Sequence, residues 1–451
     1  MVAPFNRTGR KTSLVQRRLG QVFYHLFSFE TLFVLFLYSN EIKVLLPPLP
    51  ADETVLFCAA SMAVGVWLIA REGIYMRGLV ITGLALLFVA FAILSLGWTP
   101  SRILARQRIA YLVVFNMWCV IGAAMIIARS RERTLRFLCL VLLLGLFVAV
   151  SGLRIYLTYG SFRQLPIWGE LGFTRTYLNW GYTVADGAGV ALVITLFSRF
   201  ASLKQLVAGG MLLLCAAFLL VGGARGPLLG LALASLVAIS VRPPRVLPGR
   251  FEVSTGQLVG VALVVAGAAY VSWLIATGQS TTTLSRFTKL FDQMEGDTAV
   301  KGASRLIYWP AAIRMWTEAP WIGHGFASFS YLFHHGPEEP GAHPHNVVLQ
   351  ILAELGVVGL ILFGVFAWSG LRHAGLQRLR EDPLMVCVLI YFTTGLMNPL
   401  FARELTGGRK LFTIIGLLAL QPVAQAVVER ARSGSSSRRG ESSEPEPGGS
   451  A

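Results

Sequence analysis

Charged residues are scarce in this sequence, and cysteines are few. Only 14% of the 451 residues are charged, whereas 55% are hydrophobic and the mean hydropathy is +0.63. A soluble protein of this length could not bury so much apolar surface, so an ordinary soluble fold is excluded. The five cysteines fall within apolar runs, so neither a disulfide framework nor a cysteine metal site is implied. They are Cys58, Cys119, Cys139, Cys215 and Cys387.

Familiar catalytic motifs are missing as well. No P-loop, dinucleotide-binding fingerprint, serine nucleophile elbow or paired-carboxylate signature stands out. Acidic residues number 23 against 39 Lys and Arg, a formal net charge of +16. The basic residues are scattered over many short loops, so we do not expect nucleic-acid binding. Such an excess is typical of loops that face the cytoplasm in membrane proteins.

Apolar runs near 20 residues long recur along the chain. This is the length that a helix needs to cross a hydrocarbon layer of about 30 Å, and helices satisfy their own backbone hydrogen bonds in lipid. The sequence therefore predicts an all-α polytopic membrane protein with about twelve spans. We place them near 25–46, 54–70, 77–97, 109–128, 134–153, 180–198, 203–221, 226–241, 257–277, 346–370, 383–400 and 411–428.

The spans divide the chain into five segments. Residues 1–24 form a basic N-terminus, expected in the cytoplasm, and residues 25–277 hold the first nine spans. Residues 278–345 form a large polar loop on the outer side, and residues 346–428 hold the last three spans. The tail 429–451 is too polar to bury an apolar face, so we predict that it is disordered and cytoplasmic. The first apolar run lacks a cleavage site, which favours a retained helix over a removed signal peptide.

Many arginines fall in the outer segments of this topology. Outer loops are normally poorer in Lys and Arg than cytoplasmic ones, so the exceptions suggest an anionic ligand. Phospholipid headgroups, or a topology shifted by one helix, are the alternatives. The outer basic residues include Arg102, Arg106, Arg108, Arg154, Arg163, Arg175, Arg225, Arg305, Arg314, Arg403, Arg409 and Lys410.

Residues 301–359 interrupt the apolar pattern with a polar, aromatic stretch that holds five of the seven histidines. Pro344 should hold His343 extended, and a helix should begin near His345 and Asn346. The dipole of that helix disfavours an imidazolium at its N-terminus, and a neutral histidine can act as a general base. We therefore expect His345 to be a base at the outer membrane edge.

Two other readings of the histidines remain open. His345 could be a capping or packing residue, or His334, His335, His343 and His345 could bind a metal. The spacing His-Pro-His is poor for chelation on one helix face, and the loop has no cysteine. We therefore expect no metal.

Two further arginines lie where helices should begin. The segment Gly222–Pro227 joins two spans, and a helix N-terminus beside Arg225 is a good phosphate site. Ser304 can cap a helix, which places Arg305 in its first turn, where a cation opposes the dipole unless an anion lies nearby. The alternatives are a hairpin arginine that contacts lipid headgroups and an interfacial helix with aromatic anchors.

Three acids fall within predicted spans: Glu30, Asp186 and Glu354. Such acids are costly in lipid and often functional. A buried ion-pair partner for an arginine is an equal alternative. Glu354 lies nine residues after His345 on the same helix, too far to orient its ring.

Together these pieces resemble the O-antigen ligase and polymerase superfamily of bacterial inner-membrane glycosyltransferases. The strongest match is His345-Asn346, a nine-residue gap and then Gly356-Val357-Val358-Gly359, which is similar to the ligase signature. Arg305 and the run from Pro320 to Gly325, followed by Ser328-Phe329, resemble the superfamily's arginine-to-glycine block. Gly-Ala-Arg-Gly around Arg225 is similar to its Ser-Arg-Gly element, with Ala224 in place of the usual hydroxyl residue.

The resemblance implies a GT-C-like fold with a large helical periplasmic loop between spans nine and ten. It also implies a role for each of several residues. His345 would be the catalytic base, and Arg225 and Arg305 would bind a diphosphate. Gly356 and Gly359 would be structural. The candidates for donor or acceptor binding are Arg154, Arg163, Arg175, His343 and Asn346.

The implied reaction transfers O-antigen from undecaprenyl diphosphate to a sugar hydroxyl of lipid A–core, at the periplasmic face of the inner membrane. It would invert the anomeric carbon and need no metal or other cofactor, because the donor is already activated. A polymerase or protein O-oligosaccharyltransferase of the same superfamily is the alternative. A transporter of anionic lipids is a third reading, for which we find no internal repeats.

Overall fold

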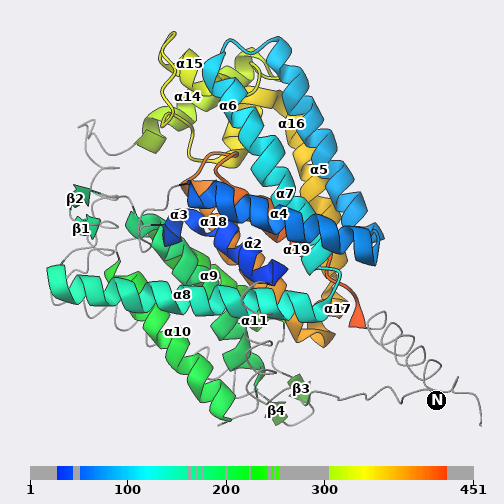
Figure 1. Ribbon diagram of the computed structural model, residues 1–451, viewed down its shortest axis with the longest axis vertical. Helices are drawn as coiled ribbons and strands as arrows, with labels where there is room; N and C mark the ends of the chain where they lie inside the picture. The colour runs from blue at the N-terminus through cyan, green and yellow to red at the C-terminus, as the bar shows by residue number, and fades with distance from the viewer. Residues whose placement is uncertain are drawn as a thin grey trace, which may run out of the picture.

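The computed structural model describes residues 28–43, 51–160, 164–167, 170–173, 176–198, 202–222, 225–241, 245–247, 250–252 and 304–423. These residues form a bundle of helices with two small antiparallel hairpins (Figure 1). The predicted N-terminus 1–24, the predicted span near 257–277, residues 278–303 and the tail 429–451 lie outside the described residues.

The first half of the described chain runs from α2 to α8. Its elements are α2 (Phe29–Leu37), α3 (Ser39–Ile42), α4 (Glu53–Glu72), α5 (Met76–Leu94), the 3-10 turn η1 (Ser95–Gly97), α6 (Ile103–Tyr111), the π-helix η2 (Leu112–Asn116), α7 (Met117–Ile121), the π-helix η3 (Gly122–Ile127) and α8 (Arg131–Tyr159). The segments from α6 to η3 form one continuous helical run.

The remaining elements follow the hairpin of β1 (Gln164–Ile167) and β2 (Glu170–Phe173). They are α9 (Thr176–Phe197), α10 (Leu203–Val221), α11 (Arg225–Val241), the hairpin β3 (Arg245–Leu247) and β4 (Arg250–Glu252), α14 (Ser304–Glu318), α15 (Ser328–Phe333), α16 (Val347–Leu371), the 3-10 turn η4 (Arg372–Ala374), α17 (Leu376–Glu381), α18 (Pro383–Phe401) and α19 (Arg409–Leu417).

Eight helical segments of the described chain are long and apolar enough to cross a membrane, and α11 is a shorter apolar helix of 17 residues. The predicted all-α polytopic membrane fold is confirmed. Two predicted spans are shorter than expected within the described residues. Nine-residue helices, α2 and α19, fall within or beside the predicted spans 25–46 and 411–428. A nine-residue helix rises about 14 Å, which is half of the hydrocarbon thickness. The predicted count of twelve stays a prediction.

The centre of the bundle is formed by α9 and α18. In their most apolar 18-residue windows, 89% of the residues of α9 and 72% of those of α18 are buried, against 22% for α4. Outer helices instead expose large apolar side chains, such as Val66 on α4 and Leu86 on α5, at 59% and 57%. Long helices that expose many large apolar side chains are typical of proteins surrounded by lipid.

The polar stretch after α14 packs into a break in α16. Gly356 has φ 66°, which interrupts the helix one third of the way along it. The turn at residues 320–325 fills this break, because Val357 N–H donates to Pro320 O at 2.9 Å and Gly325 N–H donates to Glu354 O at 2.8 Å. A Cβ atom at Gly356 would overlap the backbone of Trp321. The block from Pro320 to Gly325 and Gly356 thus form one structural unit.

Figure 1 shows α14 and α15 together beyond the adjacent ends of α5, α6 and α16, at the top of the view. The polar stretch therefore covers one end of the bundle, which we call the His345 end. The opposite end of α18 begins at Asp382, which accepts hydrogen bonds from Leu384 and Met385 N–H as the N-cap. We call it the Asp382 end.

Candidate active site at the start of α16

His345 lies directly before the capping residue of α16. The Asn346 side chain caps the helix by accepting hydrogen bonds from Val348 N–H at 2.9 Å and Leu349 N–H at 3.0 Å. His345 adopts the left-handed backbone conformation, with φ 54°. This conformation is unfavourable for a non-glycine residue, and such strain concentrates at functional sites.

Two contacts orient the His345 ring. Its Nδ1 lies 3.1 Å from Ala402 O, and the ring stacks on Tyr308 with centroids 6.0 Å apart and planes 28° apart. Because a carbonyl oxygen can only accept, Nδ1 is the donor in this bond. When the ring is neutral, Nε2 therefore carries the lone pair, and this is the atom that can take a proton from a hydroxyl.

His343 lies against His345, with ring centroids 4.0 Å apart. Burial lowers the pKa of His343 to about 3, and the neighbouring charges of His345 and Arg108 add to this effect. His343 Nδ1 donates to Gly341 O at 3.0 Å, so its Nε2 is an acceptor. That Nε2 is buried and has no hydrogen-bond partner among the described residues. His343 is thus a neutral side chain with an unused acceptor beside the candidate base.

Arg108 of α6 ties the histidine loop to the loop that follows α18. Its Nη2 lies 2.9 Å from Glu404 Oε2 and donates to Pro340 O at 3.2 Å. Arg108 is only 4% exposed, and its Nη1 has no hydrogen-bond partner within the described part of the chain. Buried polar groups are nearly always hydrogen-bonded, so the unpaired Nη1 and the unpaired Nε2 of His343 are candidates for contact with a polar ligand.

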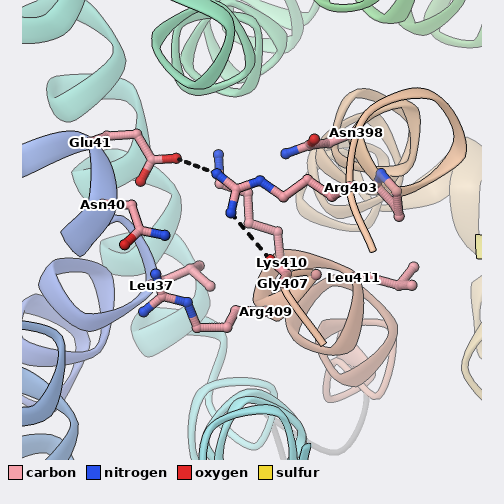
Figure 2. Close-up of a pocket in the computed structure, with 11 residues that line it drawn as sticks. Leu37, Asn40, Glu41, Asn398, Arg403, Gly407, Arg409, Lys410 and Leu411 are labelled. Atoms are coloured by element: carbon pink, nitrogen blue, oxygen red, sulfur yellow. Dashed lines mark hydrogen bonds and ion pairs between the residues drawn. The ribbon is translucent and has the colours of Figure 1, made fainter. Parts of the chain in front are cut away.

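A pocket lined by Arg403, the residue after Ala402, lies between the C-terminal end of α18, the segment 407–411 and the junction of α2 with α3. Figure 2 shows Arg403 reaching across it, with Glu41 on one side and Lys410 and Arg409 below. Arg403 Nη2 donates to Asn179 Oδ1 at 2.7 Å and lies 3.9 Å from Glu41 Oε1. Three of the basic residues that the sequence places in outer segments thus gather in one pocket.

Arg225 is the first residue of α11, and this helix start lies near the same pocket. A Cβ atom at Gly226 would overlap the Tyr182 hydroxyl, and Tyr182 Oη donates to Met397 O at 3.4 Å. Met397 directly precedes Asn398, which lines the pocket. The predicted phosphate-binding helix start therefore lies beside the pocket.

Arg305 is the second residue of α14, and its side chain lies outside the described part of the structure. Three residues further along, Tyr308 stacks on His345, and Trp309 Nε1 donates to Pro344 O at 2.9 Å. Because residues three and four apart share a helix face, the backbone of Arg305 lies one turn from the ring contacts of His345.

The other predicted ligand-binding arginines are not brought to this site by the described residues. Arg154 lies on α8 and is exposed, whereas Arg163 and Arg175 lie outside the described residues. His324 Nε2 bonds to Met315 O, and His334 Nε2 lies 3.4 Å from Glu339. Within the described ranges, no three His, Cys, Asp or Glu side chains are arranged to hold a metal ion.

The three acids in the predicted spans have different partners. Glu30 lies 3.7 Å from Arg133, and Asp186 accepts from Lys410 Nζ at 3.1 Å. Glu354 accepts from Ala327 N–H at 3.0 Å, inside the turn that fills the α16 break. The ion-pair interpretation therefore fits Glu30 and, with a lysine in place of an arginine, Asp186.

Sequence reasoning missed the contribution of the 402–408 loop to this site. Ala402, Arg403 and Glu404 contact His345, Asn179 and Arg108 respectively. The one signal was the outer cluster Arg403, Arg409 and Lys410, which suggested an anionic ligand without indicating that it lies beside His345.

Comparison with known proteins bears on the segment that holds most of these residues. Residues 210–364 match the family model described as O-antigen ligase. The predicted family resemblance is confirmed. The matched segment contains Arg225, Arg305, His345 and the two glycines of α16, whereas Arg108 and the 402–410 segment lie outside it.

Two curated relatives show the same similarity locally. A Rickettsia felis protein named "Putative polysaccharide ligase" is 29% identical over 115 residues, which cover 22% of this chain and 28% of the relative. A similarly named Rickettsia conorii protein is 29% identical over 117 residues, with the same coverage. The similarity thus spans little more than a quarter of either relative's length.

Proposed function

We propose that this protein is an O-antigen ligase. It transfers O-antigen polysaccharide from undecaprenyl diphosphate to a sugar hydroxyl of lipid A–core and so completes lipopolysaccharide. The observation that carries the proposal is the placement of His345. This residue lies within the segment that matches the O-antigen ligase family, and Ala402 O orients its ring. The active site faces the periplasm of the bacterial inner membrane.

The proposed reaction is a single displacement. The acceptor hydroxyl gives its proton to His345 Nε2 as its oxygen attacks the anomeric carbon of the donor sugar. The bond from that carbon to the diphosphate oxygen breaks, and its electron pair leaves with the diphosphate. Attack from the opposite side inverts the anomeric carbon, which NMR of the product would establish.

Arginine residues stabilise the leaving group in this proposal. Arg225, at the start of α11, and Arg305, one turn from Tyr308, bind the diphosphate as negative charge grows on it. Arginine suits this role because its guanidinium is always charged and binds two oxygens at once. Replacing either residue with Lys should impair transfer, and full activity of both Lys variants would contradict this role.

His343 and Asn346 support the acceptor side. His343 Nε2 is a buried acceptor beside the His345 ring, suited to a sugar hydroxyl, whereas the Asn346 side chain caps α16 and positions His345 through the backbone. Arg154, Arg163 and Arg175 remain candidates for contacts with the glycan. The donor supplies the activation, so the reaction requires no metal, and chelators should leave transfer unchanged.

Deletion of the gene in its native host tests the proposal. A ligase defect leaves long polymer on the lipid carrier and leaves lipid A–core bare. Core that carries a single repeat unit would instead identify a polymerase. Unchanged lipopolysaccharide together with loss of glycan from a protein acceptor would favour the O-oligosaccharyltransferase alternative. Failure of an anionic lipid to cross the membrane would favour a transporter.

A further inference from the structure

The pocket beside Ala402 carries an excess of buried positive charge. Arg403, Arg409 and Lys410 line it, whereas Glu41 is its one acidic lining residue among those described. Lys410 is already neutralised by Asp186, behind the pocket, at 3.1 Å. Arg403 lies 3.9 Å from Glu41, a long ion pair.

Among the described residues, Arg409 has no carboxylate in direct contact, and it shares the nearby charge of Glu41 with Arg403. It is 8% exposed, and its hydrogen bonds go to neutral groups: Nη1 donates to Phe36 O at 2.7 Å and to Ser39 Oγ at 3.1 Å. Its guanidinium also lies 5.2 Å from the Phe36 ring centroid. Within the described residues, no carboxylate oxygen lies within 4.0 Å of it. A buried charge without a counter-charge is costly unless a ligand brings one.

Two hydrogen-bond acceptors that line the pocket receive no hydrogen bond from the described residues. Asn398 Oδ1 and Glu41 Oε2 are buried and have no hydrogen-bond partner among the described residues. Asn398 is 6% exposed and Glu41 is 3% exposed. An inorganic anion would satisfy the arginines and leave these oxygens unbonded. A ligand that joins an anion to hydroxyl or amide N–H groups would satisfy both sets.

We infer that this pocket binds a sugar diphosphate at the junction between its phosphates and its first sugar. Arg403 and Arg409 hold the phosphate oxygens, and Glu41 and Asn398 accept hydrogen bonds from the sugar. The inference rests on the proposed function, because the donor of that reaction contains this junction. It adds residues from outside the segment that matches the ligase family.

The position of the pocket suits this role. Ala402 O bonds to His345 Nδ1, and the next residue, Arg403, reaches across the pocket. Asn398, which also lines the pocket, follows Met397. The carbonyl oxygen of Met397 accepts a hydrogen bond from Tyr182, beside the start of α11. A diphosphate in the pocket would therefore lie between Arg225 and the candidate base.

Binding of geranyl diphosphate to the full chain in phosphatidylcholine nanodiscs tests the phosphate part. We expect Arg403→Gln to weaken binding tenfold or more, and Arg409→Lys, which keeps the charge but loses the planar fork, to weaken it several-fold. Arg71→Gln is the control, because Arg71 is an exposed arginine in the last turn of α4 and does not line the pocket. Melting temperatures establish that each variant is folded. If Arg409→Lys does not fold, the affinity of Arg403→Gln for geranyl diphosphate alone decides whether the inference holds.

His345→Asn separates this inference from the proposed function. It should bind geranyl diphosphate like the wild type while losing transfer. Loss of transfer in His345→Asn with unchanged binding in Arg403→Gln would overturn the pocket and leave the ligase proposal standing. Weaker binding in Arg403→Gln, in a protein whose deletion leaves lipopolysaccharide intact, would keep the diphosphate site and overturn the ligase.

Two further binding measurements identify the ligand. Replacing phosphatidylcholine with phosphatidylglycerol should leave the affinity for geranyl diphosphate within twofold, and strong competition would identify the pocket as a site for phospholipid headgroups instead. Glu41→Gln should leave the affinity for geranyl diphosphate equal or higher, but weaken binding of a polyprenyl-diphosphate sugar several-fold. Equal effects on both probes would overturn the assignment of Glu41 to the sugar.

Discussion

The arginines of residues 129–136 and those beside His345 are held in different ways. At the Asp382 end, every arginine from residue 129 to residue 136 has a carboxylate within 4.0 Å. Arg131 binds both Asp382 oxygens, at 2.6 and 2.7 Å, and Arg133 lies between Glu30 and Glu72. These arginines are matched by acids of the same chain and need no ligand.

At the His345 end the match is incomplete. Arg108 Nη1 and His343 Nε2 are buried without hydrogen-bond partners in the described residues, and Arg409 donates its hydrogen bonds to the neutral groups Phe36 O and Ser39 Oγ. We expect the paired arginines of residues 129–136 to stabilise the fold, and the partly paired ones beside His345 to contact a ligand. A variant at the Asp382 end should therefore change stability, and a variant at the His345 end should change binding or catalysis.

The sharpest test compares two histidines at the His345 end that share one backbone conformation. His345 and His335 have φ 54° and 55°, and asparagine tolerates this region well. Loss of a general base costs about 10²- to 10⁴-fold in rate, so His345→Asn should lower transfer by that factor without changing the melting temperature. His335→Asn should match the wild type. Transfer assays with purified protein and lipid-linked donor provide the measurement, and equal rates for the two variants would remove His345 as the base.

A second test disrupts the scaffold of the His345 end. Gly356→Ala places a Cβ against the Trp321 backbone at a positive φ, so it should destabilise the fold by about 3 kcal/mol or more. Gly364→Ala in the same helix is the control, because a Cβ there meets no atom within 4 Å. Thermal unfolding in detergent measures both. A Gly356→Ala protein as stable as the control would show that the 320–325 turn tolerates displacement.

A third test breaks the matched pair at the opposite end. Asp382 is 2% exposed, binds Arg131 and caps α18, so Asp382→Asn should cost about 3 kcal/mol of stability and lower the yield of membrane-inserted protein. The rate per folded molecule should be unchanged. Glu132→Gln, with a side chain 65% exposed, should change neither quantity. A large fall in the intrinsic rate of Asp382→Asn would contradict the division between the two ends.

The sequence predicted the helical membrane fold because apolar run length depends on local composition alone. The break at Gly356 could not be predicted, because it depends on the 320–325 turn, which satisfies the freed backbone groups from outside the helix. Counting arginines by side of the membrane had a similar limit. Each arginine counts as one charge, whatever its partner. Arg131 is neutralised by an acid 251 residues away, whereas Arg409 donates to a neutral carbonyl oxygen.

The candidate site, like the fold, could be predicted from the sequence only in part. The start of α16 was predictable from Pro344 and Asn346, since turn and capping chemistry are local. The orientation of the His345 ring was not, because it comes from Ala402, 57 residues further along the chain. The low pKa of His343 likewise comes from packing against distant groups such as Arg108.

A smaller effect concerns how the histidine loop is attached to α6. The Glu338 carboxylate accepts hydrogen bonds from Arg102 and Leu104 N–H, each at 2.7 Å, so it caps that helix from another part of the chain. Glu338→Ala should cost about 1–2 kcal/mol, as the loss of an N-cap does. It should also raise KM more than it lowers kcat, because the loop beside the site loosens. Glu318→Ala, an exposed acid on α14, is the control. Equal stability of the two variants would show that this cap does not hold the loop.

The smallest effect is an acid sensitivity that arises from His343. Its pKa is about 3 in the folded protein, because burial disfavours the charged ring, whereas an unfolded histidine titrates near 6.5. Below pH 6.5 the unfolded state therefore binds a proton that the folded state does not, so stability falls as the pH falls, by about 1 kcal/mol at pH 6. His343→Gln should flatten the fall in melting temperature between pH 7.5 and 5.5. The exposed-histidine variant His335→Gln should keep the wild-type slope. Parallel curves for all three proteins would mean that His343 takes up a proton as readily folded as unfolded, and its Nε2 could not then serve as the unprotonated acceptor that distinguishes this end of the bundle.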